Sequence, residues 1–359
     1  MKFNNLKNLT ILILTYKRHR ELQNKIRYLS KYNYKVLIID GTPTPFSKRY
    51  YKQFKQIEYH HYPTENYHDR IFFSKKYIKT KYVKIESDND YFVPSAMNKS
   101  IHFLEKNNDF SAVIGKCAIY SVFKNQVYIK SLFTKHKSLI DNNPSKRCDD
   151  YMQYYSPALY HSVCRSKIFK MNIDFWKKCK KIYKNDFHHF AEICLPLVCL
   201  INGKLKCLNH LTWIRADDKI ENRLNYIGTK KIMPRPEKHH FYASKLLNMF
   251  DSGYFEKFFK LFDKEMIKKN SINFSFMSLK TIYIRYMSKR DLKSKKLLIF
   301  SKIIKICTFL IPIYLKKNIR FFLRKNGPTV NEIINKNFEV NYKFSTKELN
   351  LINKSIKSL

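Results

Sequence analysis

The sequence predicts an α/β fold in which a mostly parallel sheet is flanked by helices and followed by a helical C-terminal extension. Two short runs, "LTILILT" at residues 9–15 and "KVLIID" at residues 35–40, are apolar on both faces, which is typical of buried parallel strands. Segments with apolar residues at helical spacing alternate with such runs, and this alternation indicates crossover units. The 359-residue chain is 44% hydrophobic and 16% aromatic, so it can bury a large core.

The first 116 residues contain the clearest alternation of strands and helices. A helix with Leu22, Ile26 and Leu29 on one face follows the first strand, and the turn-rich "GTPTP" ends the second strand. Pro94, followed by Ser95 as the expected N-cap, marks the start of another helix. We therefore expect strands at residues 9–15, 35–40, 57–62, 82–87 and 111–116, with helices around residues 22–29, at residues 67–80 and after residue 95.

The second half of the chain is expected to hold fewer regular elements. Residues 116–185 mix short strands with loops, whereas residues 187–202 predict a buried helix that Gly203 closes and that Pro196 either kinks or delays. Beyond about residue 234 the composition turns to Lys, Phe, Leu and Ile with helical spacing. The expected elements and regions are short strands at residues 204–208 and 211–215, a domain at residues 1–235 with halves at 1–115 and 116–235, and a basic helical region at residues 236–359.

The chain is strongly basic. It carries 70 Lys and Arg residues against 28 Asp and Glu, a formal charge of +42, so an anionic partner or environment is expected. Nucleic acid, an anionic membrane surface and phosphorylated substrates all fit, and so does a solvated basic surface on a chain of biased composition. The eight Cys residues form no C-x-x-C motif, which favours reduced thiols and the cytoplasm. The apolar run before Thr15 is too short for a signal peptide.

Polar residues follow several expected strands, at the positions where open parallel sheets bind their ligands. Asp40, the segment "TYKR" at residues 15–18 and the stretch "KIESDND" at residues 84–90 all lie at or just past strand ends, so we expect them to face one crevice. Asp88 and Asp90 form a D-x-D pair, a simple way to hold Mg²⁺ or Mn²⁺ next to phosphate oxygens. A solvated acidic turn or a helix cap is the alternative interpretation. The sequence has neither a G-x-G-x-x-G loop nor a Walker A loop.

With these strand ends in place, the sequence resembles the GT-A glycosyltransferases, in particular the family 2-like enzymes of bacterial surface-polysaccharide synthesis. The resemblance covers roughly residues 8–220. Its most specific part is "YVKIESDNDYFVPSAMNKSIHFLEKNNDFSAVIG", and it continues in "FAEICLPLVCLINGKLKCL" and "TWIRADD". It implies a nucleotide-diphospho-sugar transferase fold. It also implies a metal-dependent, inverting transfer of a sugar from a UDP-, CDP- or GDP-sugar to a cell-surface glycan or a lipid-linked acceptor.

The resemblance also implies roles for particular residues. Glu192 would be the catalytic base, and Asp88 and Asp90 would bind Mn²⁺ or Mg²⁺. The residues implied for donor binding are Thr15, Tyr16, Arg18, Asp40, Asp69, Arg70, Asp88 and Arg215. This sequence departs from the family pattern at Asn89, and at Ala191, where the family has the first acid of a Glu-Asp pair.

Other interpretations stay open from the residues themselves. Glu192 lies in an apolar stretch and fits a structural helix residue paired with a Lys, and Asp40 fits a cap on the following turn. The two departures from the family pattern leave a non-catalytic carbohydrate- or nucleotide-binding relative as a second candidate function. The charge leaves a basic nucleic-acid-binding protein as a third candidate, although no recognisable nucleic-acid-binding motif is present.

A further basic feature lies near the C-terminus. Residues 297–325, "LLIFSKIIKICTFLIPIYLKKNIRFFLRK", are mostly apolar but include Lys302 and Lys305. Because charges near the centre of a spanning helix are costly, the pattern favours a helix that lies on an anionic membrane surface. A helix packed on the enzyme's own surface or in a dimer fits equally well. We expect a cytoplasmic protein, with the inner face of the cytoplasmic membrane as a candidate peripheral site.

Overall fold

The computed structural model describes residues 6–123, 126–132, 137–153, 157–183, 187–216, 254–267, 329–335, 340 and 343–357. The contacts divide the chain into two units: the first comprises Met1–Cys148, Ser156–Ala216 and Gly327–Leu359, and the second comprises Asp149–Tyr155 and Asp217–Asn326. The C-terminal end of the chain therefore belongs with the first unit. This grouping concerns contacts, and the division into functional regions at residue 235 stays a prediction.

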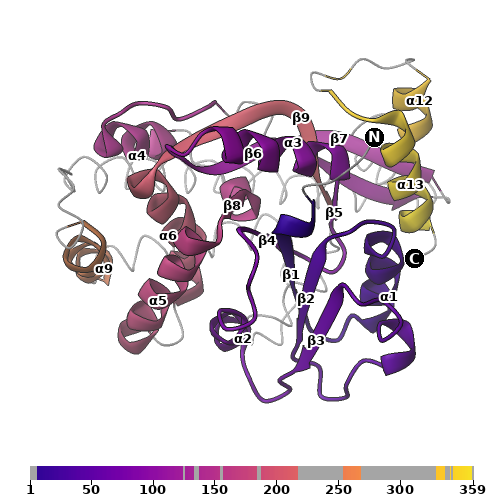
Figure 1. Cartoon of the computed structure of the whole chain (residues 1–359), viewed down its shortest axis with the longest axis horizontal. Coiled ribbons are helices and arrows are strands. Elements are labelled where there is room, and N and C mark those ends of the chain that lie inside the picture. Colours follow the sequence, from indigo (N-terminus) through magenta and orange to yellow (C-terminus); the bar gives the residue numbers. More distant parts are fainter. Residues whose placement is uncertain are drawn as a thin grey trace, which may run out of the picture. The chain divides into compact units, whose positions relative to one another are not determined.

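The described part of the first unit contains one sheet of nine strands (Figure 1). The strands are β1 (Leu9–Thr15), β2 (Lys35–Asp40), β3 (Ile57–His61), β4 (Tyr82–Glu86), β5 (Tyr91–Phe92), β6 (Phe110–Phe123), β7 (Gln126–Leu132), β8 (Val163–Arg165) and β9 (Lys204–Ala216). Their order is β3-β2-β1-β4-β8-β6-β9-β5, with β7 paired to β6. Neighbours from β3 to β4 are parallel, as are β6 and β9, whereas β5, β7 and β8 pair antiparallel. The predicted α/β class with a mostly parallel central sheet is confirmed.

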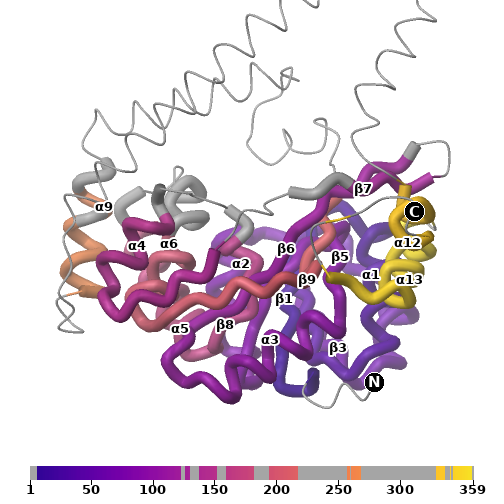
Figure 2. Tube along the Cα trace, turned by 90° about the horizontal axis from the view of Figure 1, so that it is seen from above, coloured from indigo at the N-terminus to yellow at the C-terminus, as the bar shows by residue number. Residues whose placement is uncertain are grey.

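Helices flank this sheet (Figures 1 and 2). In the first unit they are α1 (His19–Leu29), α2 (Tyr67–Ser74), α3 (Pro94–Lys106), α5 (Ser166–Tyr183), α6 (Phe187–Asn202), α12 (Val330–Ile334) and α13 (Thr346–Lys357), with short 3-10 turns η1 (Leu6–Asn8), η2 (Lys48–Tyr50) and η3 (Pro157–His161). Helix α4 (Pro144–Gln153) begins in the first unit and ends in the second. The described part of the second unit holds α9 (Tyr254–Phe262) and a π-helical turn at Asp263–Ile267.

The strands predicted at residues 9–15, 35–40, 57–62 and 82–87 are confirmed to within one residue. The predictions were wrong where strands are longer: residues 111–116 are part of β6, and the two short strands after residue 203 form the single strand β9. Register shifts between β6 and β9 interrupt the regular pairing of these strands. The pattern of apolar residues along each strand is therefore broken, although the strand itself continues. At one shift a Cβ atom on Gly115 would lie 2.5 Å from the carbonyl oxygen of His210, so the two backbones approach too closely for a side chain at this position.

The C-terminal helix α13 packs on the first half of the chain. Its residues Leu349, Ile352 and Ile356 are buried in the same hydrophobic core as Leu22 and Ile26 of α1. Figures 1 and 2 both show α13 beside α1, although the two helices lie at opposite ends of the sequence. The last helix therefore completes the core that the first strands and helices begin.

Glu348 of α13 caps the start of α3. The backbone N of Ser95 donates a 2.7 Å hydrogen bond to Glu348 Oε1, and the Ser95 hydroxyl donates to the other carboxylate oxygen. Ser95 is therefore not the N-cap that was predicted: the cap position is Val93, and Pro94 opens the helix. A carboxylate at a helix N-terminus satisfies a free N–H group and the helix dipole together, and here it comes from a distant part of the chain.

Among the described residues, no helix is both long enough and apolar enough to cross a membrane. The stretch at residues 297–325, predicted to lie on a membrane surface or to pack as a helix, is outside the described residues.

We predict that Glu348→Ala lowers the free energy of unfolding by about 1–2 kcal/mol, because the Ser95 N–H group loses its partner and the helix N-terminus loses a negative charge. Urea denaturation measures the change. Glu105→Ala removes an exposed acidic residue from the same helix α3 and should shift the value by less than about 0.5 kcal/mol. Equally small changes in both variants would contradict the capping role of Glu348.

Candidate functional site at the carboxyl ends of the parallel strands

The carboxyl ends of β1 and β4 meet at Asp88. Its Oδ2 accepts a 2.7 Å hydrogen bond from Thr15 Oγ1, and its Oδ1 accepts a 3.3 Å hydrogen bond from Arg18 Nη1. Asp88 and Thr15 are buried, whereas 15% of the Arg18 side chain is exposed. Burial raises the pKa of the Asp88 carboxyl, and the Arg18 guanidinium opposes that shift. The structure thus brings together two of the three strand ends that were expected to face one crevice.

Asp40, at the end of β2, is fully buried among hydrogen-bond donors. Its Oδ1 accepts a 2.8 Å hydrogen bond from the backbone N of Thr42. Its Oδ2 accepts one of 2.8 Å from Tyr59 Oη and lies 2.9 Å from His19 Nε2. The contact with Thr42 is the turn cap that was the alternative interpretation of this residue. Asp40 therefore joins β2 to its own turn, to β3 and to α1.

Arg70 of α2 is only 2% exposed and supports the ends of β1 and β2 from inside. Its Nη1 donates hydrogen bonds to the carbonyl oxygens of Thr15 and Ile39. A Cβ atom on Gly41 would lie 2.6 Å from Arg70 Cζ, so the chain needs glycine here for the guanidinium to reach these carbonyls. The Arg70 guanidinium also lies over the ring of Tyr16, 6.0 Å from its centroid, so Arg70 contacts the two strand ends and the residue that follows β1.

Asp90 faces the other half of the sheet. Its Oδ2 accepts a 3.0 Å hydrogen bond from Trp213 Nε1, and its Oδ1 accepts one of 2.9 Å from the backbone N of Ala216. Both partners lie on β9, and we call these two hydrogen bonds the Asp90 bridge. Burial raises the pKa of Asp90 to about 7, with Glu86 adding to the shift and Arg215 opposing it.

Glu86, the third carboxylate of the acidic stretch, lies among buried lysines. Lys84 Nζ is 2.6 Å from Glu86 Oε2 and Lys25 Nζ is 3.8 Å from Oε1, and these three side chains are at most 1% exposed. Neither oxygen accepts a hydrogen bond from the described residues, so the attraction is between charges. Burial lowers the pKa of Lys25, and the charges of Glu86 and Asp90 oppose that shift. The acidic stretch therefore neutralises buried cations as well as ending a strand.

The fit of a metal ion can be judged from the carboxylates. Among the described residues, no group of three or more His, Cys, Asp or Glu side chains is arranged to hold one. Each oxygen of Asp90 accepts one hydrogen bond in the Asp90 bridge, and the oxygens of Asp88 accept hydrogen bonds from Thr15 and Arg18, so both carboxylates are already held by donors. One carboxylate is enough for Mg²⁺ when substrate phosphates supply further oxygens. Asp88 has the partly exposed Arg18 as a neighbour, whereas both hydrogen-bond partners of the Asp90 carboxylate lie on β9, and metal binding by Asp88 and Asp90 stays a prediction.

The other predicted site residues are more scattered. Tyr16 follows β1 and is partly exposed. Arg215 on β9 directly precedes Ala216, whose backbone N–H group donates to Asp90. Asp69 of α2 forms an ion pair with Lys180 of α5. Glu192 belongs to α6, and its side chain is outside the described part of the structure. Their assigned roles stay predictions.

Trp213 and His161 are residues near the site that sequence reasoning missed. Their rings stack with centroids 4.0 Å apart and an angle of 28°, and His161 Nδ1 lies 3.2 Å from the carbonyl oxygen of Ile85. Burial lowers the pKa of His161 well below its usual value, and the charge of Lys84 adds to this effect. The segment "TWIR" predicted a strand, but nothing in the sequence indicated that its Trp would contact a distant His and the acidic stretch.

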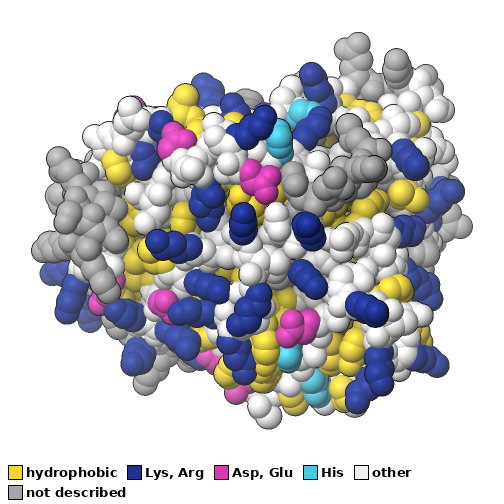
Figure 3. Space-filling view, viewed as in Figure 1, with side chains coloured by type: hydrophobic (Ala, Val, Ile, Leu, Met, Phe, Trp, Pro, Cys, Tyr) yellow, Lys and Arg dark blue, Asp and Glu magenta, His cyan; other side chains and the backbone are white. Residues whose placement is uncertain are grey.

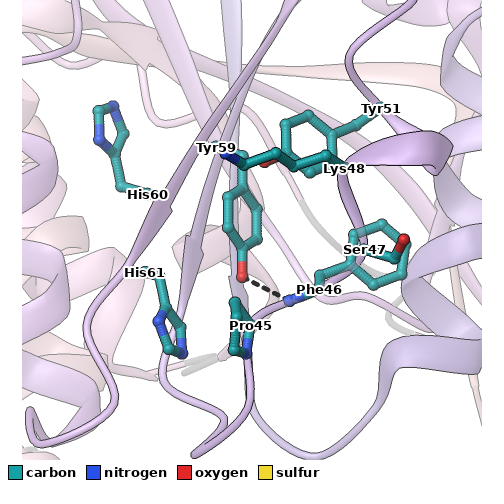
Figure 4. Close-up of a pocket in the computed structure, with 8 residues that line it drawn as sticks. All are labelled: Pro45, Phe46, Ser47, Lys48, Tyr51, Tyr59, His60 and His61. Carbon is teal, nitrogen blue, oxygen red and sulfur yellow. Dashed lines mark hydrogen bonds between the residues drawn. The ribbon is translucent and has the colours of Figure 1, made fainter.

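A pocket with a volume of 460 Å³ lies beside β3. It is lined by Pro45, Phe46, Ser47, Lys48, Tyr51, Tyr59, His60 and His61. Figure 4 shows the Tyr59 side chain reaching toward the loop, where its Oη accepts a 2.8 Å hydrogen bond from the backbone N of Phe46. Because Tyr59 Oη also donates to Asp40, the pocket adjoins the end of β2.

We predict that His161 makes the chain less stable as the pH falls below about 6.5, whereas Asp90, whose pKa is raised to about 7, acts in the opposite direction, so the test compares variants with wild type. His161 stays neutral in the folded chain because its pKa is lowered, whereas the unfolded chain takes up a proton there, so acid favours unfolding. For this group the loss approaches about 1.4 kcal/mol per pH unit. His161→Phe keeps an aromatic ring against Trp213 and cannot titrate, so its free energy of unfolding should fall less than that of wild type.

Urea denaturation at about pH 7.5, 6.5 and 5.5 measures these slopes across the usual histidine pKa. His102→Gln, which changes an exposed histidine on α3, is the matched control and should keep the wild-type slope. Identical slopes for wild type and His161→Phe would show that His161 does not contribute to the pH dependence.

No protein-family model matches this sequence, and no curated protein matches it. Among solved structures, the crystal structure of S. aureus TarS 1-349 aligns with a TM-score of 0.44 at 11% identity, over 80% of this chain and 88% of that chain. The crystal structure of TarS 1-349 in complex with UDP-GlcNAc aligns with a TM-score of 0.43 at 11% identity, over 67% of this chain and 66% of that chain. Another crystal structure of TarS aligns with a TM-score of 0.42 at 11% identity, and this chain spans only 43% of that chain's length. Similarity at this level does not assign a function.

Proposed function

We propose that this chain is a glycosyltransferase of the GT-A kind that takes a sugar from a nucleotide-sugar donor. The observation that carries the proposal is the meeting of Thr15, Arg18 and Asp88 at the ends of β1 and β4, next to Asp40 at the end of β2. Ligands of open α/β sheets bind at such ends. The absence of dinucleotide and P-loop signatures from the sequence, and its resemblance to GT-A enzymes, favour a nucleotide-sugar as that ligand.

The turn after β1 suits the diphosphate of such a donor. Lys17 is exposed and has a left-handed backbone conformation with a φ of 55°, and its N–H group donates a 2.8 Å hydrogen bond to Thr42 Oγ1. This contact holds Lys17 and Arg18 at the edge of the sheet. Positive groups fixed beforehand at that edge would stabilise the negative charge that grows on the diphosphate as the glycosidic bond breaks.

Asp88 is the residue proposed to hold a divalent cation, together with the donor phosphates. With Mn²⁺ or Mg²⁺ bound, the added positive charge would favour departure of the diphosphate. Asp90 is the second residue proposed for this binding, and its carboxylate is also held by the Asp90 bridge.

The acceptor half of the reaction needs a base. A hydroxyl of the acceptor must lose its proton as its oxygen attacks the anomeric carbon, so a carboxylate must lie within hydrogen-bond distance. We assign this role to Glu192 of α6, as the resemblance implies. One direct attack of this kind inverts the anomeric configuration. The acceptor class is a cell-surface glycan or a lipid-linked glycan, with transfer in the cytoplasm or at the inner membrane face.

A non-catalytic carbohydrate- or nucleotide-binding relative is the second candidate function. The observation that favours it is Ala191, which precedes Glu192 where the family has an acid. Such a protein would bind the donor and leave it intact, so turnover separates the two candidates. Nucleic-acid binding is the weaker candidate, because it gives no role to Asp88 at the end of a parallel strand.

We predict that Asp88→Asn weakens binding of UDP-GlcNAc, the donor chosen as first probe, at least tenfold, because Thr15 and Arg18 lose the charge that orders them. Wild-type binding should strengthen with Mn²⁺, and the variant should lose this dependence. Calorimetry with and without Mn²⁺ measures both. Asp109→Asn, which changes an exposed acid paired with Lys204, should bind like wild type. Wild-type affinity in a folded Asp88→Asn protein would refute the donor site.

We predict that Glu192→Gln lowers transfer by roughly 10²–10⁴-fold and leaves donor affinity unchanged, since the amide keeps the size of the side chain but cannot accept the proton. Initial rates with UDP-GlcNAc and calorimetric affinities, taken on one preparation, give the two quantities. Glu105→Gln on α3 is the control and should keep full activity. A fully active Glu192→Gln enzyme would remove Glu192 as the base.

A further inference from the structure

Helix α5 presents a row of lysines to solvent. It buries Phe169, Ile173, Trp176 and Cys179, each 0% exposed, on one face. The opposite face carries Lys167, Lys177, Lys178 and Lys181, which are exposed, and Lys170, which is partly exposed. We call these five residues the α5 lysine row. Steps of three or four residues lead from Lys167 through Lys170, Asp174 and Lys178 to Lys181, and Lys177 is adjacent to Lys178, so all five lysines lie on one side of the helix.

The basic surface extends onto the neighbouring chain. The backbone N of Ser166, which opens α5, donates a 2.9 Å hydrogen bond to the carbonyl oxygen of Lys81, so the exposed lysines Lys79 and Lys81 lie at the start of the row. Residues 67–81 and 166–183 together contain ten lysines against two aspartates. Both aspartates already form ion pairs, Asp69 with Lys180 and Asp174 with Lys75. Figure 3 shows Lys and Arg side chains gathered in the lower left of that view, where Figure 1 labels α5 and α2.

The row has a direction with respect to the candidate site. Its first residues lie near Lys81, directly before the amino end of β4. Its last residues lie near Asp69, in the first turn of the helix that follows the carboxyl end of β3. At 1.5 Å per residue the row is about 21 Å long. It therefore runs along the flank of the sheet toward the edge where Asp40, Thr15 and Asp88 lie.

The chemistry of the row favours an extended anion. A surface helix that enters a bilayer presents large apolar side chains next to its cations. The large exposed hydrophobic residues of the described chain are Val122 and Ile140, and neither belongs to α5 or α2. Repeated cations without such apolar side chains attract a partner by charge alone, and a linear arrangement fits a partner whose charges also repeat along a line.

We infer that the α5 lysine row binds a linear polyanionic glycan, a chain with a carboxylate or phosphate on each repeat, and directs it to the carboxyl edge of the sheet as the acceptor. The assignment as acceptor rests on the proposed glycosyltransferase function, whereas the binding of the polyanion does not depend on it. This inference names the chemical class of acceptor that the proposed function leaves open.

The test is direct binding of a fluorescent oligogalacturonate, a linear glycan with one carboxylate per sugar, measured by anisotropy on the full chain. One variant combines Lys167→Gln, Lys170→Gln, Lys177→Gln and Lys181→Gln. The matched control combines Lys31→Gln, Lys35→Gln, Lys52→Gln and Lys55→Gln, four exposed lysines near β2 and β3. Both variants lose the same charge. A neutral dextran of equal length and vesicles of anionic lipid are the comparison ligands.

We expect the row variant to bind oligogalacturonate at least tenfold more weakly than wild type, and with a smaller dependence on salt because fewer counterions are released. The control variant should change less than about threefold, since its lysines act only through the distant field of the protein. Dextran should not bind. Equal losses in both variants would overturn the inference in favour of net charge. Row-dependent binding of vesicles without binding of oligogalacturonate would overturn it in favour of a membrane.

UDP-GlcNAc affinity and turnover of the same proteins separate this inference from the proposed function. A wild-type chain that binds oligogalacturonate through the row but neither binds nor turns over a nucleotide-sugar would end the acceptor assignment and keep the polyanion site. A chain that transfers sugar with unchanged oligogalacturonate affinity in the row variant would end the inference and keep the proposed function.

Discussion

The Asp90 bridge is the interaction on which the arrangement of the site depends. Strands β4 and β9 are separated in the sheet by β8 and β6, yet Asp90, four residues after the end of β4, bonds to Trp213 and Ala216 of β9. Residues 87–90 therefore lead the chain from a parallel strand of the first half to an antiparallel pair with β9. Asp88 lies within this connection, so its approach to Thr15 and Arg18 depends on both ends being held.

A basic chain that collects three carboxylates in one stretch does so here largely for internal reasons. Glu86 balances the buried Lys84 and Lys25, Asp90 ties two strands together, and Asp88 alone is paired with a partly exposed cation. Removing one member of such a buried set leaves another charge without a partner, which costs far more than the loss of a surface pair. The stretch therefore serves the fold and the proposed site together, and its three acids have three different roles.

The sequence predicted the elements whose cause is local. The buried strands at residues 9–15 and 35–40 and the position of Asp40 and Asp88 at strand ends follow from apolar runs and their ends. Contacts between distant residues were not predictable in this way. The cap on α3 comes from Glu348, and the partners of Asp90 lie on a strand that the pattern divided in two. The D-x-D pattern marks acids two positions apart, but only tertiary packing decides that Asp90 points toward Trp213.

The proposed function requires a nucleoside diphosphate to bind at the carboxyl ends of β1, β2 and β4. A crystal structure of the chain soaked with UDP and Mn²⁺ would show where the nucleotide lies. We expect nucleotide density in contact with the turn at Lys17 and Arg18, with its phosphates next to Asp88 and the Asp90 bridge intact. Density confined to the pocket beside β3, or a nucleotide bound elsewhere with Asp88 and Arg18 still paired and uncontacted, would contradict it.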